Sequence, residues 1–130
     1  MMDVDFSGSA VVVTGGAGGI GRAIAKACAA AGARVAVLDV KHEETASLLE
    51  ELPGEGHLCV TGDAGVEEDV RFFAEKVLEH FGRVDVLVNN ACITRHGILS
   101  GCSYEDFNEV LREGVAAPYL LSLLFRDHFS

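Results

Sequence analysis

Short apolar runs alternate along this chain with longer stretches in which apolar residues recur every three or four positions. Short, nearly continuous apolar runs are typical of strands that are buried on both faces of a parallel sheet. A recurrence of three to four positions is instead typical of helices with one apolar face. The pattern therefore predicts strands over residues 10–14, 34–39, 57–61 and 84–89.

A helix is expected after each of these strands. Gly82 predicts where the third helix ends, because glycine readily adopts the left-handed backbone that closes a helix. Ser103, with Asp106 three residues later, is typical of a capped helix start, and Gly114 and Pro118 predict a bend in that fourth helix. The expected helices cover residues 19–31, 42–52, 66–81 and 103–129.

The apolar faces of the first three helices are expected to pack against the sheet, because their residues recur at helical spacing. The remaining helical positions are mostly charged or small. These faces comprise Ile20, Ile24, Ala27, Cys28 and Ala31 in the first helix, Leu48, Leu49 and Leu52 in the second, and Val66, Val70, Phe73, Val77 and Phe81 in the third.

The alternation predicts an α/β fold, a Rossmann-like doubly wound parallel sheet in a single domain over residues 1–130. Four β-α units joined by right-handed crossovers place the strands in the order 3-2-1-4. The fourth strand then lies at an open, apolar edge, and the sequence ends where a fifth strand is expected. We therefore expect an incomplete domain, truncated before the fifth strand, that associates through this edge.

A glycine-rich segment, T-G-G-A-G-G-I-G over residues 14–21, lies between the first strand and the first helix. In such a turn the free backbone N–H groups and the positive end of the helix dipole bind a diphosphate, and larger side chains would keep the phosphates away. The spacing differs from the usual G-x-G-x-x-G of dinucleotide-binding folds, so a tight turn without a ligand is the alternative. The candidate cofactor-binding residues here are Thr14, Gly15, Ala17, Gly18, Gly19, Ile20 and Gly21.

Asp39 ends the second strand, eighteen positions after Gly21. A dinucleotide-binding fold places there the acid that accepts hydrogen bonds from the hydroxyls of the adenine ribose. A carboxylate at this position also repels a 2′-phosphate, so the sequence favours NAD over NADP as the cofactor. Lys41 and His42 follow closely and leave a phosphate contact open, and a simple turn-capping role for Asp39 is the other alternative.

The composition narrows the classes of partner. The net charge is −10 and the pI is near 4.8, and no basic stretch is present for nucleic acid or an anionic membrane. No apolar run approaches the roughly 18 residues of a membrane span, and the acidic N-terminus differs from a signal peptide. The cysteines form no C-x-x-C pair, which predicts reduced, packed thiols, no metal site and a cytoplasmic location.

Four separated features occur in the order and spacing of the short-chain dehydrogenase/reductase family, and the chain resembles the classical type of that family. They are the glycine-rich segment, Asp39, Asp63 after the third strand, and N-N-A over residues 89–91. The stretch V-D-V-L-V-N-N-A-C-I over residues 84–93 is similar to the family's V-D-x-L-V-N-N-A-G-I. The resemblance covers nearly the whole chain and corresponds to the N-terminal, cofactor-binding half of such an enzyme.

The resemblance implies an NAD-dependent oxidoreductase that transfers hydride to or from a small alcohol or carbonyl substrate. It implies that Gly15, Gly19, Ile20 and Gly21 line the diphosphate, that Thr14 forms a hydrogen bond in the turn, and that residues 16–18 form the loop. It places Asp63 and Ala64 beside the adenine, although capping of the third helix is an alternative for Asp63. Asn89 is expected to tie neighbouring strands together, and Asn90 and Ala91 to present polar groups to the riboses.

Two residues depart from the family pattern. Cys92 stands where the family has the glycine of N-N-A-G, and Gly114 stands where it has an asparagine that holds a proton-relay water. The family's catalytic serine and Tyr-x-x-x-Lys would follow beyond residue 130, and neither Tyr104 nor Tyr119 has a lysine four residues on. The chain alone is therefore expected to be inactive as a dehydrogenase, and the family implies a homo-oligomer.

Two other functions fit parts of the sequence. The first is a non-catalytic module that binds a dinucleotide or acts only by association through its edge strand. The second is a methyltransferase that binds S-adenosylmethionine through the glycine-rich turn and Asp39, which leaves Asn89, Asn90 and Ala91 without a role.

Overall fold

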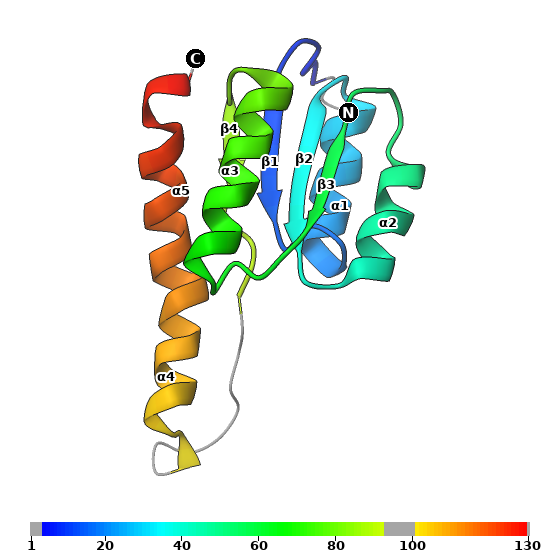
Figure 1. Ribbon diagram of the computed structural model, residues 1–130. Helices are drawn as coiled ribbons and strands as arrows, with labels where there is room; N and C mark the ends of the chain where they lie inside the picture. Colours follow the sequence, from blue (N-terminus) through cyan, green and yellow to red (C-terminus); the bar gives the residue numbers. More distant parts are fainter. Residues whose placement is uncertain (1–3, 93–100, 130) are drawn as a thin grey trace.

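A four-stranded parallel sheet forms the centre of the molecule, with helices on both of its faces (Figure 1). The computed structural model describes residues 4–92 and 101–129. The strand order β3-β2-β1-β4 is the predicted one, so the Rossmann-like arrangement is confirmed. The strands are β1 (Ala10–Thr14), β2 (Arg34–Asp39), β3 (Leu58–Thr61) and β4 (Val86–Val88).

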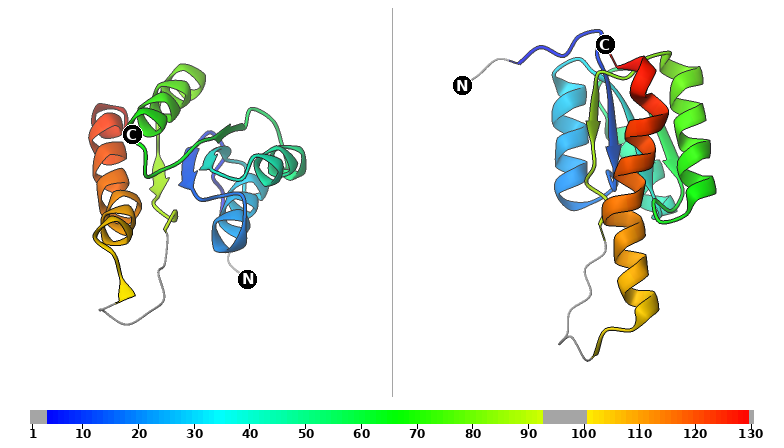
Figure 2. Two further views of the ribbon diagram at one scale, coloured as in Figure 1. Left: turned by 60° about the horizontal axis from the view of Figure 1, so that its bottom comes forward. Right: turned by 90° about the vertical axis from the view of Figure 1, so that its left-hand side faces the viewer.

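The helices form two layers. One layer contains α1 (Gly19–Ala30) and α2 (His42–Glu51). The other contains α3 (Glu67–Phe81) and a long helical rod, whose first part projects beyond the carboxyl ends of the strands (Figure 2). The rod is built from α4 (Tyr104–Leu111), a π-helical turn η2 (Arg112–Ala116), α5 (Ala117–Phe125) and a final 3-10 turn η3 (Arg126–His128).

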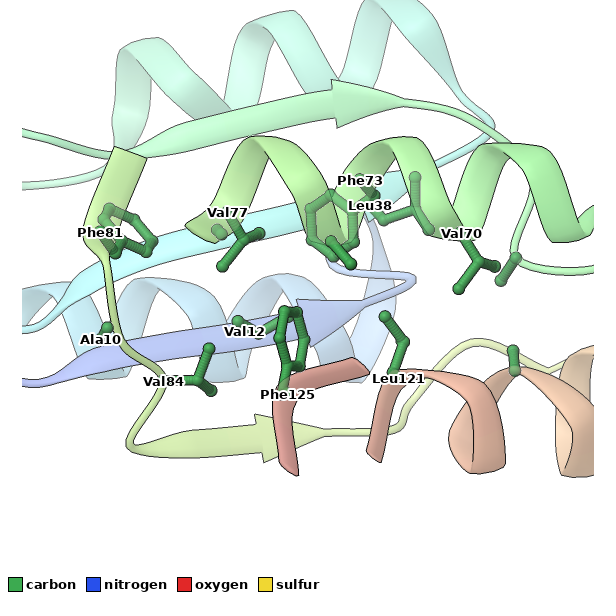
Figure 3. Packing of buried hydrophobic residues seen from close by; sticks show 14 residues of the cluster. Ala10, Val12, Leu38, Val70, Phe73, Val77, Phe81, Val84, Leu121 and Phe125 are labelled. Carbon is green, nitrogen blue, oxygen red and sulfur yellow. The ribbon is translucent and has the colours of Figure 1, made fainter. Parts of the chain in front are cut away.

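Alternate residues of β1 pack on opposite faces of the sheet, and all five are buried. Val11 and Val13 belong to the cluster under α1 and α2, whereas Ala10 and Val12 pack with α3 and α5 (Figure 3). Burial on both faces explains why the strand is apolar at nearly every position. The core holds the carboxyl ends of β1, β2 and β4 in fixed register, which positions the loops that follow them.

All three predicted helix faces need correction, and on α3 the residue concerned is Val66, which is the N-cap and is 41% exposed. On α1 the buried residues are Gly21, Ala25 and Ala29, whereas Ile20 is 76% exposed and Ala27 is exposed as well. Small residues on this face let the helix approach the sheet closely, so the larger residue lies outside the contact. On α2, Leu48 and Leu52 are one helical turn apart and buried, whereas Leu49 faces away and is 44% exposed.

The fourth helix begins as predicted but does not simply bend. The Ser103 hydroxyl accepts the N–H of Asp106 over 3.0 Å, and the Asp106 carboxylate accepts the N–H of Ser103. At the expected bend, the N–H of Ala117 donates to the carbonyl of Arg112, five residues back, in a π-helical turn. Pro118 has no N–H to donate, and such a turn accommodates a proline inside a continuous helix.

The predicted open edge beyond β4 is paired at one point. Val84 forms a parallel bridge with Phe129, and its N–H donates to the carbonyl of His128 over 3.1 Å. The chain after η3 thus returns alongside the residues that lead into β4. Among the described residues, no helix has both the length and the apolar character needed to cross a membrane.

Candidate cofactor site

A cleft of about 570 Å³ lies at the carboxyl ends of the strands. Its lining comes from the loops after all four strands and from the α4–η2 segment. The loops after β1 and β2 lie beside each other, and the loop after β4 borders β1 on its other side, which is where doubly wound folds bind ligands. Lining residues that the sequence predicted are Gly15, Gly18, Gly19, Ile20, Asp39, Asp63, Ala64, Asn90 and Ala91.

Thr14 lies behind the cleft rather than in its wall. Its side chain is buried, and its hydroxyl oxygen accepts the N–H groups of Asn90 and Ala91, each over 3.1 Å. The expected hydrogen-bonding role in the turn is therefore a link between the end of β1 and the loop after β4. This link fixes the distance between two walls of the cleft.

Asn90 provides a second link between these walls. Its side-chain amide donates to the carbonyl oxygen of Gly15 over 3.0 Å. A Cβ on Gly21 would lie 2.2 Å from that oxygen and 2.4 Å from the Asn90 amide nitrogen, so only glycine fits there. The amide that ties β1 to β4 is thus that of Asn90, whereas Asn89, to which the sequence assigned this tie, is exposed.

The glycines of the turn fall into two groups. Gly21 is required by contacts within the protein, and Gly15 by its φ of +65° and its approach to Ala91. Gly18 and Gly19 have open space where a Cβ would stand and both line the cleft, although the φ of +55° at Gly19 also favours glycine. A larger side chain would therefore extend into open space at Gly18, whereas at Gly21 it would meet the protein itself.

The start of α1 suits an anion. Gly18 is its N-cap and has no side chain that could accept a hydrogen bond from the first N–H groups of the helix. These donors, together with the positive end of the helix dipole, face the space beside Gly18 and Gly19. An uncapped helix start opening into a cleft of this size fits the diphosphate of a dinucleotide.

Asp39 is held in a fixed orientation at the edge of the cleft. One carboxylate oxygen accepts the N–H of Ala17 and the other accepts the N–H of Lys41, each over 3.0 Å. A carboxylate has about four lone-pair sites, so each oxygen retains capacity for a ligand hydroxyl. The turn-capping role and a ligand-binding role are therefore compatible in Asp39.

Asp63 does not cap α3. Its side chain accepts the N–H of Gly65 over 2.7 Å, and its own N–H donates to Asp69 over 2.9 Å. The N-cap of α3 is Val66, which makes no side-chain capping bond. The capping alternative is wrong, and Asp63 stands with the buried Ala64 at the β3 end of the cleft.

Sequence reasoning missed the carboxylates that the rod brings to the cleft. Glu109 and Glu113 line it, and Glu113 is buried. A Cβ on Gly65 would lie 3.3 Å from the Glu113 side chain, so Glu113 packs against the loop after β3. In the sequence, the only indication of this role was that Glu113 directly precedes Gly114, which replaces the asparagine of the family pattern. No cluster of three metal-binding side chains occurs within residues 4–92 and 101–129.

A family model described as short chain dehydrogenase matches residues 9–130. The chain belongs to this family. An uncharacterized oxidoreductase from Thermotoga maritima is 38% identical over 122 residues, which are 92% of this chain and 47% of that protein. The chain spans about half the length of the curated relatives it matches.

Solved structures extend the comparison to cofactor complexes. A blue fluorescent protein from a metagenomic library, in complex with NADPH, has a TM-score of 0.89 and 31% identity, with 96% of this chain and 53% of that chain covered. A 3-ketoacyl-(acyl-carrier-protein) reductase from Brucella melitensis, complexed with NADH, also has a TM-score of 0.89 and 31% identity, with 96% and 52% covered. One of these two structural neighbours therefore holds NADPH and the other NADH.

Proposed function

We propose that this chain is the NAD-binding half of a short-chain oxidoreductase that interconverts an alcohol and a carbonyl compound. One observation carries the proposal: the uncapped start of α1 and the oriented carboxylate of Asp39 line the same cleft. The first suits a diphosphate and the second suits the hydroxyls of a ribose attached to it. The bound dinucleotide would supply hydride transfer.

The other lining residues would bind the remaining parts of the cofactor. Gly18, Gly19 and Ile20 would contact the diphosphate, and Asp63 with Ala64 would border the adenine at the β3 end. Asn90 and Ala91 would face the second ribose at the β4 end, where their positions are fixed by Thr14. Since Cys92 also lines this end, its sulfur would lie beside the cofactor.

The preference for NAD over NADP is assigned to Asp39. Its negative charge opposes a 2′-phosphate, and Lys41 contacts it only through the backbone N–H among the described hydrogen bonds. Isothermal titration with NADH and NADPH tests this assignment. We expect NADH to bind at least about tenfold more tightly, and Asp39→Ala or Asp39→Asn to remove most of that difference.

A matched control removes one negative charge elsewhere. Glu50→Gln changes an exposed residue of α2 by the same charge and is expected to leave the NADH preference intact. Tighter binding of NADPH than of NADH by the unmodified chain would contradict the assignment.

Catalysis by these 130 residues is not expected. Tyr104 is followed four residues later by Asn108, and Tyr119 by Leu123, so neither tyrosine has the lysine that lowers a phenol pKa by its charge. We propose that the purified chain binds NADH without oxidising alcohols. Steady NADH formation with a simple alcohol would contradict this proposal.

A further inference from the structure

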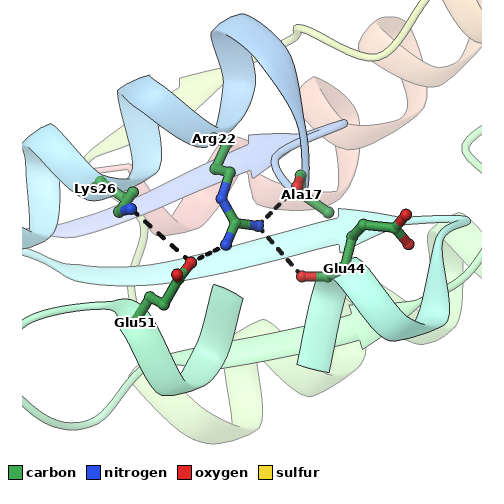
Figure 4. Close-up of polar contacts among 5 residues, drawn as sticks. All are labelled: Ala17, Arg22, Lys26, Glu44 and Glu51. Atoms are coloured by element: carbon green, nitrogen blue, oxygen red, sulfur yellow. Dashed lines mark hydrogen bonds and ion pairs between the residues drawn. The ribbon is translucent and has the colours of Figure 1, made fainter. Parts of the chain in front are cut away.

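Arg22 joins the glycine-rich turn to α2 (Figure 4). Its guanidinium donates to the carbonyl oxygen of Ala17 over 2.9 Å and to that of Glu44 over 3.4 Å, and it forms an ion pair with Glu51. The dipole of α1 disfavours a cation near the N-terminus of the helix, so Arg22 does not serve to stabilise α1. Its contacts are instead with the loop before the helix and with a neighbouring helix.

Ala17 is hydrogen-bonded to both Arg22 and Asp39. The carbonyl of Ala17 accepts from Arg22, and its N–H donates to the Asp39 carboxylate over 3.0 Å. The peptide groups on both sides of the Ala17 Cα are thus each held by a side chain, and Ala17 is buried. The Arg22 guanidinium and the Asp39 carboxylate are therefore linked through hydrogen bonds to one residue, Ala17.

Glu51 restrains the guanidinium. Its carboxylate pairs with Arg22 and lies 3.8 Å from the ammonium nitrogen of Lys26. Arg22 also borders a surface cavity of about 420 Å³, which is lined in addition by Ala17, Glu43, Glu44 and Ser47. An arginine released from its carboxylate partner beside this turn would be a bidentate phosphate ligand.

We propose that Arg22 is a positioning residue for the adenine ribose and that Glu51 holds it back from a 2′-phosphate. This inference rests on the proposed NAD-binding function. Arg22 aligns Asp39 through Ala17, while the ion pair with Glu51 keeps the guanidinium on α2. Discrimination between NADH and NADPH is therefore set partly by Arg22 and Glu51, neither of which lines the cleft.

The deciding experiment compares two neighbouring glutamates on α2. Isothermal titration of the chain with NADPH is expected to show about fivefold tighter binding in Glu51→Gln, because the freed guanidinium reaches the 2′-phosphate. The affinity for NADH is expected to change by less than about twofold. Glu50→Gln removes the same charge from an exposed residue and is expected to leave both affinities unchanged. An effect in Glu51→Gln no larger than in Glu50→Gln would overturn the inference.

Substitutions at Arg22 test the positioning role. Arg22→Gln is expected to weaken NADH binding about tenfold, since Ala17 and Asp39 lose their alignment, and Arg22→Lys to restore part of it through a single hydrogen bond. Circular dichroism establishes whether each variant is folded. Unchanged NADH affinity in a folded Arg22→Gln variant would overturn the positioning role, and if that variant does not fold, the Glu51 result decides.

The two proposals fail in different ways. If the unmodified chain binds neither dinucleotide, the proposed function fails and this inference fails with it. If the unmodified chain binds NADH and the Arg22 and Glu51 variants titrate like it, only this inference fails.

Discussion

The hydroxyl oxygen of Thr14 accepts the backbone N–H of Ala91 over 3.1 Å and so joins the end of β1 to the loop after β4. The same oxygen accepts the N–H of Asn90, also over 3.1 Å. Thr14 is only 3% exposed, so water does not compete for these bonds. One buried hydroxyl therefore holds together the two loops between which the cofactor is proposed to bind.

Removing this hydroxyl is expected to destabilise the fold. Thr14→Val has nearly the same volume but leaves two N–H groups without their acceptor, and the free energy of unfolding should fall by about 2 kcal/mol. Thr14→Ser retains the oxygen and should cost less than about 1 kcal/mol. Urea unfolding followed by circular dichroism measures both variants, and equal stability of the two would contradict the role given to the hydroxyl.

Two glycines of the turn are expected to respond differently to alanine. In Gly21→Ala the new Cβ would lie 2.2 Å from the carbonyl oxygen of Gly15, so the fold should lose about 2 kcal/mol or more. In Gly18→Ala no atom lies within 4 Å of the new Cβ and the φ is −148°, so stability should change little. The methyl group would nevertheless occupy the proposed diphosphate site.

Titration with NADH completes this comparison. Gly18→Ala is expected to weaken NADH binding about tenfold while the unfolding transition stays in place. A folded Gly18→Ala variant with normal NADH affinity would show that the diphosphate does not lie against this residue.

Most of the fold could be predicted because its strands and helices follow local patterns of apolar residues and glycines. The apolar run of β1 reflects burial on both faces, and Gly82 ends α3 in the left-handed conformation, with a φ of +71°. Leu49 and Ile20 were misplaced for a physical reason. Apolar character places a residue near the core side of a helix, but the contact itself is made by the smaller residues of α1 and by Thr45 and Leu48 of α2.

The site was predictable only in its outline. The cleft contains Asp39, Asp63 and Asn90, as their places after the strands suggested. The sequence could not show that Asn90 rather than Asn89 ties the glycine-rich turn to β4, since that depends on which side chain points toward Gly15. It also could not show that Arg22 lies over the turn, because a basic residue on a helix is usually a solvated one.

The rate at which the Cys92 thiol is alkylated can be used to detect a ligand in the cleft. Cys92 is exposed and lines the cleft, whereas Cys102 is exposed and does not line it. We expect saturating NADH to slow alkylation of Cys92 by iodoacetamide several-fold and to leave Cys102 unaffected. Peptide mass spectrometry measures both thiols in one sample, and equal slowing at the two residues would contradict a cofactor beside Cys92.

Cys59 is expected to make stability depend on alkaline pH. Burial on β3 raises the pKa of its thiol from 9.0 to about 11, so the folded state retains the proton after the unfolded state has lost it. The contribution of this thiol is therefore constant below pH 9 and decreases as the pH rises from 9 toward 11. The difference in unfolding free energy between the unmodified chain and Cys59→Val should fall over that interval. Other titrating groups are common to both proteins and cancel, so a difference that stays constant in urea unfolding from pH 8 to 11 would contradict a partly buried, neutral thiol.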